Sequence, residues 1–296
     1  MQPPHRLSTQ TRRVVRCLGA GAAVAILAFV PGSSDGGEWH RLRALVCSEC
    51  HTMHNSQDGR SMRYDNGLAP VDKLLRAASA NDLCLACHSG TIPSAPNVTV
   101  PTDFDPPGGG FPVDLTDPNH QAHGLGPNPV TPPDGDTPVV MACVTCHDPH
   151  GNGQYRNLRP SPSGTGRAAG VPVVVRQTVT ANGLNAADVY KRSNVLYQSG
   201  MSAWCMDCHN LYSNTHAPQV ALASGATVNM THWLNDPITS RVPVQSPTDL
   251  VVPSTDDQVF CLSCHKAHGS PHLSAELWAD GDAGLFDATC NQCHAL

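Results

Sequence analysis

The chain has 296 residues, a formal net charge of −6, and only 14% charged residues. It holds 5 Phe, 4 Trp and 5 Tyr against 25 Gly and 26 Pro, so breakers of regular elements are many and large side chains are few. This composition argues against an ordinary α/β enzyme core, and the low charge argues against charge-driven disorder.

The first 36 residues have the pattern of a secretory signal peptide. Arginines up to Arg16 precede an apolar run over residues 18–30, which is short for a membrane span. We predict a signal peptide over 1–36, with cleavage between 32 and 37, and one mature domain over 37–296; an uncleaved anchor is the alternative. Cleavage leaves a more acidic chain, with no basic stripe for nucleic acid or anionic lipid.

Twelve of the 13 cysteines form six C-x-x-C-H motifs, called motifs 1 to 6 in chain order. The cysteines are Cys47 and Cys50, Cys84 and Cys87, Cys143 and Cys146, Cys205 and Cys208, Cys261 and Cys264, and Cys290 and Cys293; the histidines are His51, His88, His147, His209, His265 and His294. In this motif two thiols bind one porphyrin and the adjoining imidazole binds its iron. Zinc sites and redox disulfides also use C-x-x-C, but neither explains a histidine after every pair. We therefore predict six covalently attached haem c groups.

Between the motifs the chain has mainly the Gly- and Pro-rich character of loops. Apolar spacing predicts short helices over 71–80 and 186–198, and a short hairpin strand over 171–180 ahead of Asn182 and Gly183. The predicted fold is mostly irregular, with few short α-helices and minimal β-structure. It is a multihaem cytochrome c fold wrapped around a chain of six haems.

Nine more histidines outside the signal peptide could supply the sixth ligand of each iron: His40, His54, His120, His123, His150, His216, His232, His268 and His272. Methionine is the other possible ligand and would raise the potential. His54, His150 and His268 each stand three residues after a motif histidine, which is about 4.5 Å along a helical turn. They cannot easily reach the far face of their own haem, so we expect them to ligate neighbouring haems. Haems with both axial positions filled favour electron transfer over catalysis.

Several runs around these motifs, among them Cys50-His-Thr-Met-His-Asn-Ser56 and Cys146-His-Asp-Pro-His-Gly151, resemble those of the OmcS-type hexahaem c-type cytochromes, a family of extracellular cytochrome filaments. The match spans residues 40–294 and keeps all six motifs in order. The resemblance implies a loop-rich protomer around a haem chain, two histidines on every iron, and filament growth through a histidine that crosses the subunit interface.

By this resemblance the crossing ligand is His54, which would complete the iron of His265 in the next subunit. The distal candidates are His40, His54, His123, His150, His216, His232 and His268, with His120 in reserve for His123. Seven candidates compete for six irons, and the sequence leaves open which one is not a ligand.

We predict an exported electron carrier, not an enzyme, at the cell surface or outside the cell. Its expected partners are copies of itself, other multihaem cytochromes as donors, and external acceptors. No nucleic-acid partner is expected, and no stable membrane anchor after signal cleavage. Two alternatives stay open: a monomeric periplasmic shuttle with the same haems, and a multihaem reductase with an open iron.

Overall fold

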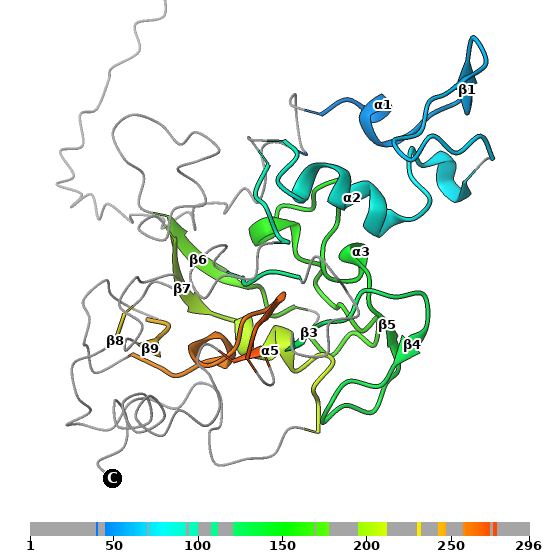
Figure 1. Cartoon of the computed structure of the whole chain (residues 1–296). Helices are drawn as coiled ribbons and strands as arrows, with labels where there is room; N and C mark the ends of the chain where they lie inside the picture. Colours follow the sequence, from blue (N-terminus) through cyan, green and yellow to red (C-terminus); the bar gives the residue numbers. More distant parts are fainter. Residues whose placement is uncertain are drawn as a thin grey trace, which may run out of the picture. The chain divides into compact units, whose positions relative to one another are not determined.

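The computed structural model describes residue 40 and residues 45–69, 71–92, 95–99, 108–111, 121–168, 170–177, 195–211, 230–231, 242–246, 257–272 and 275–276. Contacts divide the chain into two units, Met1–Pro31 and Gly32–Leu296, and all of these residues lie in the second. The predicted signal peptide and motif 6 lie outside them. Where described, the backbone is mostly irregular with short helices and two-stranded sheets, as predicted (Figure 1). No helix in this part of the chain is long and apolar enough to cross a membrane.

Each of the five described motifs overlaps a short helical segment. These segments are α1 (Cys47–Cys50), α2 (Ala80–His88), α3 (Cys143–Cys146), α5 (Met201–Cys205) and the 3₁₀ helix η4 (Cys261–Ser263). Helix α2 is the longest of these segments, and Ser79 caps its start: the Ser79 hydroxyl accepts the Asp82 N–H at 3.1 Å. A helical turn puts residues three apart on one side of the backbone, so both thiols of a motif can reach the same porphyrin edge.

The strands pair two at a time. The antiparallel pairs are β1 (Ser56–Gln57) with β2 (Arg60–Ser61), β3 (Gln121–Ala122) with β10 (Gly269–Ser270), β4 (Pro129–Val130) with β5 (Val139–Val140), and β6 (Val174–Gln177) with β7 (Val195–Ser199); β8 (Met230–Thr231) and β9 (Val242–Pro243) are parallel. The β3–β10 pair joins the chain before motif 3 to the chain after motif 5. Such long-range pairs hold the loops in place without forming an extended sheet.

The helix predicted over 71–80 is wrong. The chain there forms a 3₁₀ turn, η1 (Asp72–Leu74), and helix α2 begins only at Ala80. Lys73 and Leu74 have φ of 57° and 56°, in the left-handed region, so an α-helical ladder cannot run through them. This turn aims the Lys73 carbonyl at Nδ1 of His51, 2.9 Å away. The apolar spacing was misleading because the backbone here turns so that the Lys73 carbonyl can accept a hydrogen bond from His51.

The helix predicted over 186–198 is also wrong where the structure describes it, since residues 195–198 belong to β7. The strand predicted over 171–180 is confirmed at β6, which pairs with β7 and places Val175 opposite Tyr197. Both side chains are buried, so together they form a buried face of this two-stranded sheet. The turn predicted at Asn182 and Gly183 lies outside the described residues.

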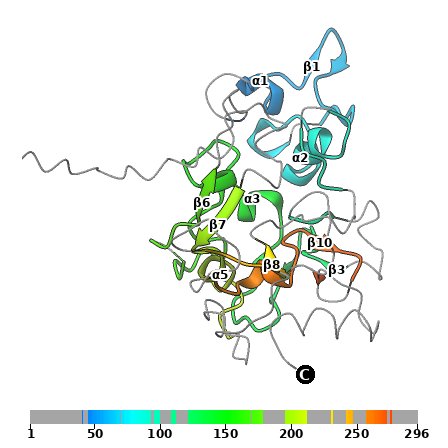
Figure 2. The same cartoon turned by 90° about the vertical axis from the view of Figure 1, so that its left-hand side faces the viewer.

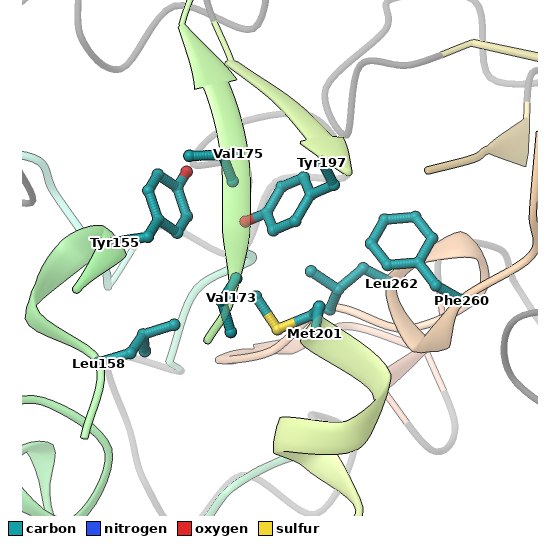
Figure 3. Close-up of a cluster of buried hydrophobic side chains, with 8 residues drawn as sticks. All are labelled: Tyr155, Leu158, Val173, Val175, Tyr197, Met201, Phe260 and Leu262. Carbon is teal, nitrogen blue, oxygen red and sulfur yellow. The ribbon is translucent and has the colours of Figure 1, made fainter. Parts of the chain in front are cut away.

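A small apolar core lies where the segments near motifs 3, 4 and 5 meet. Its buried members are Tyr155, Leu158, Val173, Val175, Tyr197, Met201, Phe260 and Leu262. Figure 3 shows the ring of Tyr197 between those of Tyr155 and Phe260, with centroids 5.6 Å and 5.5 Å away. Side chains therefore supply part of the interior, which the composition does not indicate.

The chain turns back past motifs 1 and 3 in the same way. The N–H of Arg76 donates to the Cys50 carbonyl at 2.9 Å, and the N–H of Arg159 donates to the Cys146 carbonyl at 2.8 Å. Each motif histidine also forms an isolated antiparallel bridge with the returning segment. The two motifs are thus copies of one local structural unit.

Left-handed turns occupy the same place in both copies. Lys73 and Leu74 in η1 correspond to Arg156 and Asn157 in η2 (Tyr155–Asn157), where φ is 50° and 54°. Asn is among the few residues that adopt this region readily, whereas Leu does so rarely. The two copies therefore share one backbone conformation. This conformation costs more free energy at Leu74 than at Asn157.

Candidate haem-binding centres

Backbone carbonyls hold four of the motif histidines. Nδ1 lies 2.9 Å from the Lys73 oxygen in His51, 2.9 Å from the Pro96 oxygen in His88, 2.8 Å from the Arg156 oxygen in His147, and 2.7 Å from the Pro133 oxygen in His209. A carbonyl oxygen only accepts, so Nδ1 carries the hydrogen and Nε2 keeps its lone pair. This is the tautomer that an iron ligand needs, and the bond fixes the direction of the ring.

These carbonyls are functional groups that sequence reasoning did not identify. Any residue can supply a carbonyl oxygen, so residue type gives no signal. The only local sign is the left-handed turn at Lys73 and at Arg156, and neither residue is one that the sequence marks for such a turn.

Each of the four rings faces a second histidine. The ring centroids are 6.2 Å apart in His51 and His150, 5.9 Å in His88 and His40, 6.2 Å in His147 and His268, and 6.2 Å in His209 and His123. Two metal–imidazole bonds of about 2 Å each, plus the span from each nitrogen to its ring centre, add to roughly 6 Å. The spacing therefore fits an iron ligated from both sides, and the residues present fit haem.

Burial keeps several of these rings neutral. It lowers the pKa of His268 to about 3, with a smaller contribution from His147. Burial also lowers the pKa of His147, His123 and His40. A neutral imidazole is the form that binds a metal, so these rings need no proton loss before ligation.

A glycine run seats His268. The N–H of His268 donates to the Gly108 carbonyl at 2.6 Å, and the Phe111 ring stacks on the imidazole with centroids 4.9 Å apart. Gly109 has φ of 77°, and a Cβ there would lie 2.0 Å from the Gly269 oxygen. A side chain at residue 109 would push the run away from the histidine, so glycine is required.

The described chain does not place every predicted ligand in a pair. His54 is exposed after α1, and no ring partner for it lies among the described residues. His265 and His272 are described, in and after motif 5. The remaining predicted residues, which lie outside the described residues, are His120, His216, His232, Cys290, Cys293 and His294.

The pairs follow a rule along the chain. His150, three residues after the motif 3 histidine, faces motif 1; His268, three residues after the motif 5 histidine, faces motif 3. Each such histidine thus reaches the motif two places earlier, not its own. In the other two pairs, His40 precedes motif 1 and faces motif 2, while His123 precedes motif 3 and faces motif 4.

Cysteine side chains of successive motifs lie near one another, alternately through the second and the first cysteine of each motif. The first cysteines hydrogen-bond to each other in motifs 2 and 3 and in motifs 4 and 5, as Cys84 with Cys143 and Cys205 with Cys261. The second cysteines lie close enough to act on each other electrostatically in motifs 1 and 2 and in motifs 3 and 4: burial raises the pKa of Cys50 and Cys146, and Cys87 and Cys208 raise it further. Motifs 1 to 5 therefore adjoin one another in chain order. All ten described cysteines are free, and Cys47 is the exposed one among them.

The same kind of hydrogen bond joins motif 2 to motif 3 and motif 4 to motif 5, the two pairs whose first cysteines hydrogen-bond to each other. The Cys143 N–H donates to Asn81 Oδ1 at 2.9 Å, and the Cys261 N–H donates to Ser202 Oγ at 3.2 Å. Asn81 and Ser202 each stand three residues before the first cysteine of their own motif. Figure 2, with Figure 1, shows α2 beside α3, the first of these pairs.

Asp207, between the motif 4 cysteines, organises the loop that follows motif 3. Its buried carboxylate accepts the Ser161 hydroxyl at 2.9 Å, the Ser163 hydroxyl at 2.6 Å and the Ala168 N–H at 2.7 Å. Burial alone would raise the pKa of Asp207, but these hydrogen bonds lower it below its ordinary value. A fixed negative charge therefore lies inside motif 4 at neutral pH.

Among the described residues, no three His, Cys, Asp or Glu side chains gather as a metal-ion site. A haem iron takes four ligands from porphyrin and two from the protein, so a pair of histidines completes it. Free thiols of the motif beside each pair would supply the covalent link to haem c.

This loop-rich fold, with paired histidines beside free cysteines, is what a multihaem c-type cytochrome, a class that holds haem c covalently, would require. No protein-family model matches the chain. The chain is similar to the C-type cytochrome OmcS of Geobacter sulfurreducens, at 24% identity over 84% of this chain and 81% of OmcS. The resemblance drawn from the motifs is thereby confirmed.

Two solved structures are also similar. The cryo-EM structure of OmcS nanowires from Geobacter sulfurreducens has a TM-score of 0.50 and 20% identity, over 78% of this chain and 83% of that one. The Outer Membrane Cytochrome S filament from Geobacter sulfurreducens has a TM-score of 0.49 and 19% identity, over 79% of this chain and 83% of that one. The first of these likenesses confirms the predicted loop-rich fold.

Proposed function

We propose that this protein is an exported hexahaem electron carrier, and that it serves as the protomer of an extracellular filament used in respiration to external acceptors. The similar OmcS chain, whose solved structure is of nanowires, supports this proposal. The single observation that carries it is the pairing rule of the histidines that follow the motifs.

The four facing pairs support an assignment of axial ligands for four irons. In each pair the motif histidine is proximal and its partner distal: His51 with His150, His88 with His40, His147 with His268, and His209 with His123. The facing of His123 and His209 supports His123 over His120 as the ligand before motif 3. His40 and His123 each stand before one motif and face the next. By the same order, the iron of His294 in motif 6 takes its ligand from the segment before motif 5, where His216 and His232 lie.

The pairing rule supports a partner for His54 in another molecule. His150 and His268 each reach the motif two places earlier, and residues 1–46, ahead of motif 1, hold no C-x-x-C-H motif that His54 could reach in the same way. In a head-to-tail series of copies, the motif two places before motif 1 is motif 5 of the adjoining copy. His54 would then complete the iron of His265 there, and its exposed position leaves it accessible.

The chain's residues position the irons for electron transfer. Haem c supplies reversible one-electron chemistry when bound. Cysteines of successive motifs meet in chain order, so attached porphyrins are neighbours in the same order. Histidines on both sides of an iron leave no position for a substrate, which favours a carrier over a multihaem reductase.

Export follows from the signal sequence and from the chemistry, because haem is attached to the motifs after transport. Multihaem cytochromes are the fitting donors, and external acceptors are the fitting final partners.

Electron microscopy of the secreted protein tests the filament. We expect filaments of one repeating protomer that stain for haem peroxidase activity. Discrete particles at all concentrations, in protein that carries its haems, would instead support the monomeric periplasmic shuttle, with His54 kept within its own chain.

A further inference from the structure

We infer that the Asp207 carboxylate lowers the reduction potential of the haem that motif 4 would hold. This inference rests on the proposed electron-carrier function and deepens it, because it names a residue that sets how stable an electron is at one place along the series of haems. Asp207 would act through its charge and not as a ligand.

An acidic side chain directly before the second cysteine occurs in two of the six motifs. The residues are Glu49 in motif 1 and Asp207 in motif 4. The other four motifs have neutral side chains at this position, namely Ala86, Thr145, Ser263 and Gln292. Because this position lies between the two thiols that hold one porphyrin, a charge there acts on the haem of its own motif.

The two acids differ in their surroundings. Asp207 is 0% exposed, and an attached porphyrin can only add to its burial. The side chain of Glu49 is 50% exposed, and Nη1 of Arg76 lies 3.9 Å from its carboxylate. Water and a cation therefore screen the charge of Glu49, whereas the charge of Asp207 lies in the interior.

The groups around Asp207 show that its carboxylate holds no proton. It accepts the Ala168 N–H at 2.7 Å on one oxygen and the Ser163 N–H at 2.7 Å on the other. The hydroxyls of Ser161 and Ser163 donate to it at 2.9 Å and 2.6 Å, since their own oxygens accept backbone N–H groups of the same loop at 2.8 Å and 3.1 Å. A carboxylate that only accepts hydrogen bonds is the ionised form, with a full negative charge.

The cation beside motif 4 does not cancel this charge. The guanidinium of Arg167 binds the two carboxylate oxygens of Asp136, at 2.7 Å and 3.0 Å, and reaches Asp207 at its backbone carbonyl, 3.3 Å away. In the part of the chain that the structure describes, no cationic side chain forms an ion pair with the Asp207 carboxylate. The three side chains together keep one net negative charge.

A buried charge of this kind changes the energy of an electron on the neighbouring haem. Reduction adds one electron to the iron, so a fixed negative charge opposes it, and little water is present to screen the repulsion. Propionates are common to all haems, and the proposed ligands are histidines throughout, so neither distinguishes one haem from another. The charge of Asp207 does, and it should make an electron less stable at motif 4 than a neutral residue would.

The test compares Asp207→Asn with Glu49→Gln in the secreted holoprotein, because each replaces the acid at the same motif position with its neutral amide. Redox titrations followed by haem absorption are compared with the wild type, and the difference isolates the component that moves. In Asp207→Asn we expect one haem in six to shift to higher potential by about a tenfold change in the ratio of reduced to oxidised iron, or about 59 mV for one electron. Glu49→Gln should shift its haem by less than about twofold.

Further measurements separate the charge from damage to the loop. Asp207→Asn should keep six low-spin haems, although its midpoint of thermal unfolding should fall, since the amide NH₂ group cannot accept the N–H that the carboxylate accepts from Ser163. Ser163→Ala keeps the carboxylate and removes a hydroxyl that offsets its charge, so the same component should shift to lower potential. A role in loop structure alone would not move the two variants in opposite directions.

The outcomes distinguish this inference from the electron carrier itself. An Asp207→Asn component that stays in place or moves to lower potential, in protein with six low-spin haems, would overturn the inference and leave the carrier standing. If Asp207→Asn does not load its haems, Ser163→Ala decides, and a component that stays in place or rises would overturn the inference. Wild-type protein without haem, or with haem that is not reduced and reoxidised reversibly, would overturn the proposed function as well.

Discussion

His54→Ala is expected to leave all six haems attached and to abolish filament growth. The variant keeps every cysteine and every motif histidine, so haem attachment is unaffected. What it loses is the imidazole that follows motif 1, which by the pairing rule ligates an iron in the adjoining copy. Intact-mass measurement checks the haem count, and electron microscopy with sedimentation checks assembly.

His54→Met serves as the control for a bridging ligand. A thioether also binds haem iron and raises its potential, so this variant should recover part of the assembly and shift one haem to a higher potential. A change that acts only on local structure would give neither result. Filaments of normal length from His54→Ala would refute the bridge.

His268→Ala is expected to open one iron in an otherwise closed chain of haems. His268 faces His147 at 6.2 Å between ring centroids, and Phe111 and the Gly108–Gly110 run hold it there. Without the imidazole, the iron bound through His147 has a free position. In assembled filaments, we expect carbon monoxide uptake to rise from almost none in the wild type to one molecule per chain, with one high-spin haem in the EPR spectrum.

His272→Ala, four residues further on, is the matched control because it is assigned to no iron. It should remain low-spin throughout and bind no carbon monoxide. Two results would contradict the account: carbon monoxide binding in proportion to the number of chains by assembled wild-type filaments, which would also revive the reductase alternative, or an unchanged spectrum in His268→Ala.

The motifs and the character of the fold could be predicted from the sequence because they depend on fixed spacing and composition. C-x-x-C-H is a local requirement of one porphyrin, and a chain rich in Gly and Pro forms loops. The expectation that His150 and His268 turn away from their own motifs also needed only the geometry of one helical turn. In the structure both face other motifs.

The partners of these histidines could not be predicted, because they depend on how distant loops meet. His123 illustrates this: its Nδ1 lies 2.6 Å from the Ala267 carbonyl, 144 residues along the chain. His120 is only three residues away in sequence, and no residue-type signal separates the two. The resemblance favoured His123, and the contact with His209 supports the same choice.

The errors in secondary structure have a related cause. The apolar spacing over 71–80 fits a helix, yet the backbone there turns left-handed to offer the Lys73 carbonyl to His51. The segment that includes Tyr197 also fits a helix, yet its strand completes a core built with Tyr155 and Phe260. Periodicity reports one local preference, and in this protein contacts to distant segments outweigh it.

The haem count tests the central claim most directly. Intact-mass spectrometry of the purified, secreted chain should give the mass of residues 37–296, within a few residues of that start, plus six haem c groups. An absorption spectrum of low-spin haem should accompany it. A colourless protein with the mass of the bare chain, or one that carries zinc in place of tetrapyrrole, would contradict the account.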